Sequence, residues 1–132
     1  MTVVVDTSVI IAVIANEPEK AKLIRQTTGA TLLAPASCHW EVGNAFSAML
    51  KRRRITLAQA IRALGAYEQI PVRFVEADLV RSLELAAQFG IYAYDAYVIE
   101  CALSRKSPLL TLDGGLAKAA REAGAALLEE GV

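Results

Sequence analysis

The hydrophobic positions form short continuous runs that alternate with longer segments of helical period. The short runs predict five strands: Val3–Val5, Thr31–Ala34, Val72–Val75, Leu109–Leu112 and Ala126–Leu128. Between them, apolar residues recur at spacings of about three and four, which predicts helices. These comprise two short helices between Ser8 and Gln26, and then Ala36–Lys51, Leu57–Gln69, Ala77–Phe89, Ala93–Ser104 and Leu116–Ala123.

Strands that alternate with helices indicate a parallel sheet, because the chain has to run back before the next strand can pair in parallel. Pro35, Pro71 and Pro108 fall at joints between these elements, as chain breakers should. We therefore predict an α/β fold, a three-layer α/β/α sandwich around a central, mostly parallel five-stranded sheet. The length of 132 residues and the absence of repeats or linkers predict a single domain over residues 1–132.

The composition narrows the class of protein. Hydrophobic residues make up 55% of the chain and the mean hydropathy is +0.37, which favours a sheet covered on both faces or a subunit of an oligomer. No apolar stretch reaches the roughly 18–20 residues of a membrane span, and no basic leader precedes the first strand, so we expect a cytoplasmic protein. Cys38 and Cys101 have no metal-ligand spacing and are predicted to be buried free thiols.

Carboxylates follow two of the predicted strands. Asp6 ends the apolar run of VVVDTSVI, and Asp113 ends the strand before TLDGG turns into a helix. Parallel strands have their carboxyl ends along one edge of the sheet, where ligands bind, so we expect both acids at that edge. A buried carboxylate has to be paired, bound to metal or shifted in pKa. Each aspartate alone is equally well explained as a helix N-cap.

Two further acids border apolar faces of predicted helices. Glu41 stands three residues after Cys38 at the edge of an apolar stripe, and Asp95 shares its face with Val98 and Ile99. Either one alone could be an acid of the first turn, which the helix dipole favours. Four carboxylates in one crevice, however, cannot all stay ionised without a cation. Oxygen ligands without histidine or cysteine partners favour Mg²⁺ or Mn²⁺.

Two hydroxyl residues lie next to the strand-end acids. Ser8 is two residues after Asp6, and Thr111 is two residues before Asp113. Either hydroxyl could orient a carboxylate or a water molecule from outside the metal ligands. The structural alternatives are a helix cap for Ser8 and an ordinary β-branched strand residue for Thr111, so both interpretations stay open.

One dense basic run is a candidate RNA contact. It ends the helix that carries Glu41 and consists of Lys51, Arg52, Arg53 and Arg54. Basic side chains that contact phosphates position a nucleic acid without reading its sequence. The alternative is a solvated helix end, because the helix dipole favours cations there. The net charge of zero argues against extensive coating by nucleic acid and allows a local patch.

The four acidic segments resemble the ordered motifs of PIN-domain ribonucleases. The matching segments are DTSVI, HWEVGNAF, AYDAYVIECAL and TLD. The length and the βα pattern of the whole chain are most similar to the VapC toxins of toxin–antitoxin pairs. The resemblance implies an endoribonuclease dependent on Mg²⁺ or Mn²⁺ that hydrolyses RNA phosphodiester bonds. It also implies that Asp6, Glu41, Asp95 and Asp113 form the metal-binding catalytic set.

The same resemblance implies partners. VapC-type toxins are usually homodimers, and a cognate antitoxin (VapB-like or of another type) inserts its tail into the acidic groove. The other interpretations are a PIN-like nuclease that is not a toxin and a non-catalytic module that binds RNA or a partner. Aspartyl-phosphate chemistry, as in haloacid-dehalogenase-type phosphatases or response-regulator receivers, is disfavoured. Such enzymes need a second acid near the first, whereas Thr7, Ser8 and Val9 follow Asp6.

Overall fold

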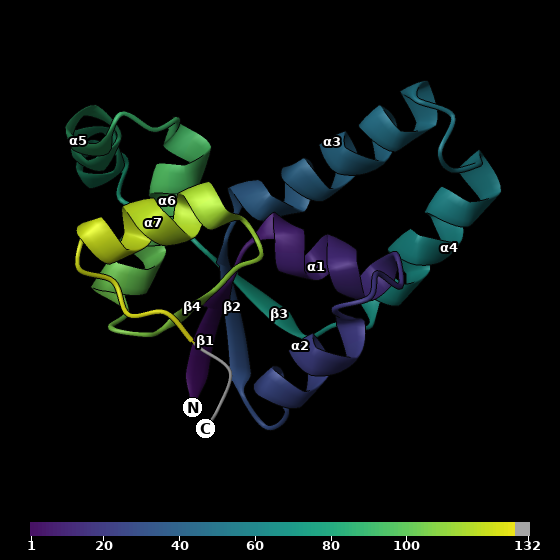
Figure 1. Ribbon diagram of the computed structural model, residues 1–132, viewed down its shortest axis with the longest axis horizontal. Helices are drawn as coiled ribbons and strands as arrows, with labels where there is room; N and C mark the ends of the chain where they lie inside the picture. Colours follow the sequence, from purple (N-terminus) through teal and green to yellow (C-terminus); the bar gives the residue numbers. More distant parts are fainter. Residues whose placement is uncertain (129–132) are drawn as a thin grey trace.

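The computed structural model describes residues 1–128 as a parallel sheet between two groups of helices (Figure 1). The sheet has four strands in the order β3-β2-β1-β4, and each neighbouring pair is parallel. The strands are β1 (Thr2–Val5), β2 (Thr31–Pro35), β3 (Val72–Val75) and β4 (Leu109–Leu110). The valines of β1 are fully or almost fully buried, as expected for a central parallel strand covered on both faces.

In the described residues there are seven helices, of which six connect successive strands and the seventh follows β4. They are α1 (Thr7–Ile14), α2 (Lys20–Thr27), α3 (Ser37–Lys51), α4 (Leu57–Glu68), α5 (Leu79–Phe89), α6 (Ala93–Ser104) and α7 (Gly114–Glu122). Helices α1 to α4 lie on one side of the strands in Figure 1, and α5, α6 and α7 lie on the other. Helix α6 packs on β1 and β2, and its residues from Val98 to Ala102 are all buried. The predicted α/β fold with a parallel sheet is confirmed.

The predicted fifth strand is wrong. The segment Ala126–Leu128 runs beside β4, but its pairing is limited to one isolated bridge between Leu109 and Leu127. The Leu109 amide donates to the Ala126 carbonyl at 2.9 Å, and the Leu128 amide donates to the Leu109 carbonyl at 2.8 Å. A strand as short as β4 offers too few free groups for a longer ladder.

The strand β4 is also shorter than the predicted Leu109–Leu112. Beyond Leu110 the amides of Leu112 and Asp113 donate to side-chain hydroxyls and not to a neighbouring strand. The chain therefore leaves the sheet as soon as it reaches the carboxyl edge.

Helices α3 and α4 form a hairpin that extends away from the sheet (Figure 1). We call residues 37–68 the α3–α4 arm. The buried side of α3 includes Val42 and Phe46, and the buried side of α4 includes Ala60, Ala63 and Tyr67. Within residues 1–128, none of the helices has the length and apolar character needed to cross a membrane. That residues 1–132 form a single domain stays a prediction.

Candidate active site

Asp6 lies where β1 ends and α1 begins, at the carboxyl edge of the sheet. Its residue surface is only 6% exposed, and its Oδ1 accepts a hydrogen bond from the Val9 amide at 3.3 Å, as an N-cap does. The Ser8 hydroxyl donates to Oδ1 at 2.6 Å, and the Thr111 hydroxyl donates to Oδ2 at 2.7 Å. Burial raises the pKa of Asp6, these hydrogen bonds lower it, and the charge of Asp113 raises it.

The hydroxyls of Ser8 and Thr111 tie the ends of β1 and β4 together. Each hydroxyl donates its one proton to Asp6, and each also accepts an amide hydrogen bond of 3.0 Å. Ser8 accepts from Leu112, and Thr111 accepts from Asp113. The Asp6 carboxylate thus fixes the path of the segment after β4. Both residues stand where they could orient a carboxylate, and that role stays a prediction.

Asp113 occupies the corresponding position at the start of α7. Its Oδ1 accepts hydrogen bonds from the amides of Gly115 at 2.9 Å and Leu116 at 3.1 Å. Asp113 is therefore an N-cap, as is Asp6. The capping role that the sequence allowed for each aspartate is confirmed. Capping leaves the charge of Asp113 exposed at the same edge, where it raises the pKa of Asp6 and of Asp95.

Glu41 reaches this edge from α3. It is the fifth residue of the helix, beyond the first turn, so the helix dipole does not account for it. Its Oε1 is buried and has no hydrogen-bond partner among the described residues. Burial raises the pKa of Glu41, the Cys38 thiol lowers it, and the charges of Asp6 and Asp95 raise it further. Such an orphaned acceptor costs about 1–3 kcal/mol, which a bound cation would offset.

Asp95 lies in the first turn of α6 and is half-buried. Burial raises its pKa, and the charges of Asp113 and Asp6 raise it further. The helix dipole remains a valid alternative explanation for an acid at this position. The raised pKa nevertheless means that the surroundings as a whole disfavour the ionised form.

The four acids form one electrostatic cluster, which we call the acid cluster: Asp6, Glu41, Asp95 and Asp113. Asp6, Asp95 and Asp113 each raise the pKa of at least one other member, and the pKa of Glu41 is raised by two of them. No basic side chain is among the main influences on the three shifted pKa values. Within residues 1–128, however, no three His, Cys, Asp or Glu side chains stand close enough to form a ready metal site. Carboxylate oxygens that repel one another suit a hard divalent cation. The coordination sphere for such an ion is not preformed in the described residues.

Cys38 lies against the acid cluster, a position that its spacing from Glu41 could have indicated. It is fully buried, and burial raises the pKa of its thiol to about 12, with smaller contributions from Glu41 and Asp6. Cys38 and Cys101 are both free and buried, as predicted, and a thiol with so high a pKa stays neutral and unreactive.

Glu100 is a buried acid that the sequence patterns did not single out. It is 6% exposed on α6, and its Oε2 accepts a hydrogen bond of 3.2 Å from the Asp78 amide, just before α5. The signal that could have identified Glu100 is a charged residue between Ile99 and Cys101, in a helix that is buried on most sides. Glu100 joins α6 to the start of α5 and does not belong to the acid cluster.

The basic run lies at the tip of the α3–α4 arm. Lys51 is the last residue of α3, and Arg52, Arg53 and Arg54 follow it, all exposed. Lys51 comes ten residues after Glu41, which is about 15 Å along a helix. The basic run is therefore separate from the acid cluster, and its contact with RNA stays a prediction.

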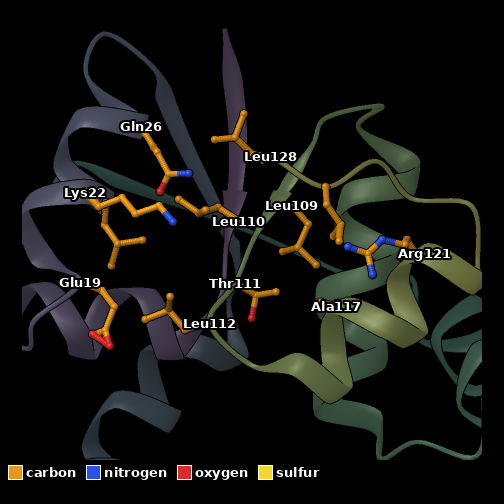
Figure 2. Close-up of a pocket in the computed structure, with 12 residues that line it drawn as sticks. Glu19, Lys22, Gln26, Leu109, Leu110, Thr111, Leu112, Ala117, Arg121 and Leu128 are labelled. Atoms are coloured by element: carbon orange, nitrogen blue, oxygen red, sulfur yellow. The ribbon is translucent and has the colours of Figure 1, made fainter. Parts of the chain in front are cut away.

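A pocket of about 300 Å³ lies beside β4 (Figure 2). Its lining includes Leu109 to Leu112 together with Glu19, Gln26 and Arg121. Thr111 belongs to this lining, whereas none of the four acids does. The pocket is a neighbour of the acid cluster and not part of it.

Comparisons with known proteins agree with this arrangement. The family model described as PIN domain matches residues 3–122. Among solved structures, the chain is similar to the crystal structure of PAE2754 from Pyrobaculum aerophilum, with a TM-score of 0.71 and 26% sequence identity. That similarity covers 90% of this chain and 87% of the other. A search of curated proteins gives no match.

The hydrogen bond from Thr111 to Asp6 can be tested by Thr111→Val. Valine keeps the shape but cannot donate, so the free energy of unfolding should fall by about 1.5–3 kcal/mol, as for bonds to charged groups. Thr31→Val is the matched control, because Thr31 is exposed on β2, and its effect should stay within about 0.5 kcal/mol. Urea unfolding at pH 7 measures both. Equal effects of the two substitutions would contradict the role of this bond.

Proposed function

Because the chain belongs to the PIN domain family, we propose that it is a divalent-metal-dependent endoribonuclease that hydrolyses RNA phosphodiester bonds. PIN domains are typically nucleases, and PIN-domain nucleases act on RNA. The observation that carries the proposal is the acid cluster at the carboxyl edge of the sheet, in which the pKa values of Asp6, Glu41 and Asp95 are raised by burial and by the charges of other members. Carboxylates gathered in this way are a binding site for a cation.

We propose that Asp6, Glu41, Asp95 and Asp113 hold Mg²⁺ or Mn²⁺. When bound, the ion supplies a Lewis acid that neutralises charge on the phosphate and activates water. The residues themselves provide position and charge. Ser8 and Thr111 hold both oxygens of Asp6 in place, and Asp113 is held through its own backbone amide. The buried Oε1 of Glu41 has lone pairs that no protein donor of the described residues uses.

RNA binding requires positive charge outside the acid cluster. We propose that Lys51, Arg52, Arg53 and Arg54 contact the phosphate backbone. Their exposure at the tip of the α3–α4 arm supports this role, since phosphate contacts position a nucleic acid without base recognition.

We further propose that the protein is a VapC-type toxin, a cytoplasmic homodimer that a cognate antitoxin inhibits through the acidic groove. The order of the four acidic segments and the βα pattern of the whole chain support this narrower assignment. The intact acid set also favours a nuclease over a module that only binds RNA or a partner.

Substitution of the acids tests the nuclease activity. We expect Asp6→Asn and Asp95→Asn to reduce Mn²⁺-dependent cleavage of a labelled RNA by at least about 100-fold, because even residues outside the metal ligands cost about 10–100-fold. Circular dichroism should show that both variants stay folded. Glu122→Gln, an exposed acid on α7, is the control and should cleave as the parent does. Cleavage at the parental rate by both asparagine variants would refute the site assignment.

Growth measurements test the toxin assignment. Expression of the parent without an antitoxin should arrest bacterial growth, because cleavage of cellular RNA would be unchecked. Expression of Asp6→Asn at the same level should leave growth normal. Normal growth at high levels of protein that cleaves RNA in vitro would instead indicate a nuclease that is not a toxin.

A further inference from the structure

The α3–α4 arm carries a charge that the rest of the chain does not share. Between Val42 and Tyr67 there are five basic side chains and no acid: Lys51, Arg52, Arg53, Arg54 and Arg62. The whole chain has 14 basic and 14 acidic residues, so the remainder has nine basic against 14 acidic. The positive charge is thus concentrated on the arm, away from the acid cluster.

These five side chains have no partner within the described part of the chain. All five are exposed, and none makes an ion pair or a side-chain hydrogen bond with another described residue. Acids on neighbouring helical turns could neutralise such a patch, yet no acid lies three or four residues from any of the five. The charge therefore remains available to an anion from outside.

A groove on the arm brings two of these cations together with apolar surface. Arg54 and Arg62 line a groove of about 550 Å³ between the end of α1 and the arm. Ile14, Met49 and Ile55 contribute apolar surface to the same groove. A ligand that fits this lining combines an apolar part with negative charge, as a nucleotide does.

Helices α1 and α3 both lead from the acid cluster to this groove. Asp6 begins α1 and Ile14 ends it, and Met49 follows Glu41 by eight residues in α3. Eight helical residues span about 12 Å. The two helices contact each other and run to the same side of the sheet (Figure 1). The groove is therefore within the reach of a strand a few nucleotides long that starts at the acids.

We propose that this groove binds one nucleotide of a single-stranded RNA substrate, a few nucleotides from the bond that is cleaved. Arg54 and Arg62 contact the phosphate, and the base packs against the apolar lining. Guanidinium groups suit this role because they pair with phosphate oxygens in a fork and stack on bases. The inference rests on the proposed nuclease function, since it assigns to that activity a second contact with its substrate.

Salt-dependent RNA binding tests the groove. A labelled uridine homopolymer is titrated with the full chain carrying Asp6→Asn, so that the RNA stays intact, and binding is followed by fluorescence anisotropy. Adding Arg54→Gln and Arg62→Gln should make the slope of log K against log salt shallower by about 0.7, the value for the loss of one phosphate contact on a single strand. Arg25→Gln with Arg73→Gln removes the same charge from exposed sites outside the groove and should leave the slope unchanged.

A second pair of variants distinguishes RNA binding in the groove from general electrostatic attraction of RNA to the arm. Arg52→Gln with Arg53→Gln removes two charges from the tip, outside the groove. At one fixed salt concentration, the groove pair should weaken binding at least about fivefold more than the tip pair, because only the groove pair removes charge-assisted hydrogen bonds to the phosphate of the bound nucleotide. Equal losses from the two pairs, or an unchanged slope in the groove pair, would overturn the proposal.

Two further outcomes are distinguishable. Tighter groove-dependent binding of a labelled oligoglutamate than of the RNA would assign the groove to an acidic protein partner and overturn the proposal. The nuclease activity is measured separately, on the parent with Mn²⁺. If RNA binding depends on the groove but the parent does not cleave RNA, the binding site is supported and the nuclease function is rejected. If the parent cleaves RNA but the groove pair binds RNA as tightly as the protein without these two substitutions, the nuclease function is supported and the binding site is rejected.

Discussion

The buried carboxylate of Asp6 is the constraint on which the arrangement of the site depends. Burial makes its charge costly, and the hydroxyls of Ser8 and Thr111 offset part of that cost by donating to both oxygens. The same hydroxyls accept the amides of the segment after β4. One carboxylate therefore joins two strand ends that are about a hundred residues apart in the sequence, and it places Asp113 beside them.

The rest of the molecule keeps the two signs of charge apart. Helices α3 and α6 bring Glu41 and Asp95 to the anionic edge, while the unpaired cations lie on the α3–α4 arm. If arginines stood beside the acids, they would neutralise them and remove the attraction for a metal ion. Under the proposed function, this separation would leave one surface for a divalent cation and another for a phosphate backbone, which is what a metal-dependent nuclease requires.

The position of Asp6 and Asp113 at one edge could be predicted, because both follow parallel strands and chain direction alone decides where such strands end. The position of Glu41 at the border of the buried face of its helix followed from its helical spacing. The fifth strand at Ala126–Leu128 was wrong because its pairing depends on the length of β4. The hydroxyls of Ser8, distant in the sequence, and of Thr111, two residues away, take the amides that would have continued β4. The buried Glu100 was missed for a similar reason, since its partner lies before another helix.

The cost of ionising the acid cluster, which arises from burial and from repulsion between the acids, is tested most directly by the free energy of unfolding of the metal-free protein, with Asp95→Asn compared against the parent. Because the pKa of Asp95 is raised in the fold, the variant should be more stable at pH 7. That gain should shrink as the pH falls through the raised pKa of the folded state and vanish well below 3.8, the ordinary pKa of aspartate, where the carboxyl group is protonated in both states. Added Mn²⁺ should stabilise the parent more than the variant. A metal-free parent that is the more stable of the two at pH 7 would contradict the repulsion.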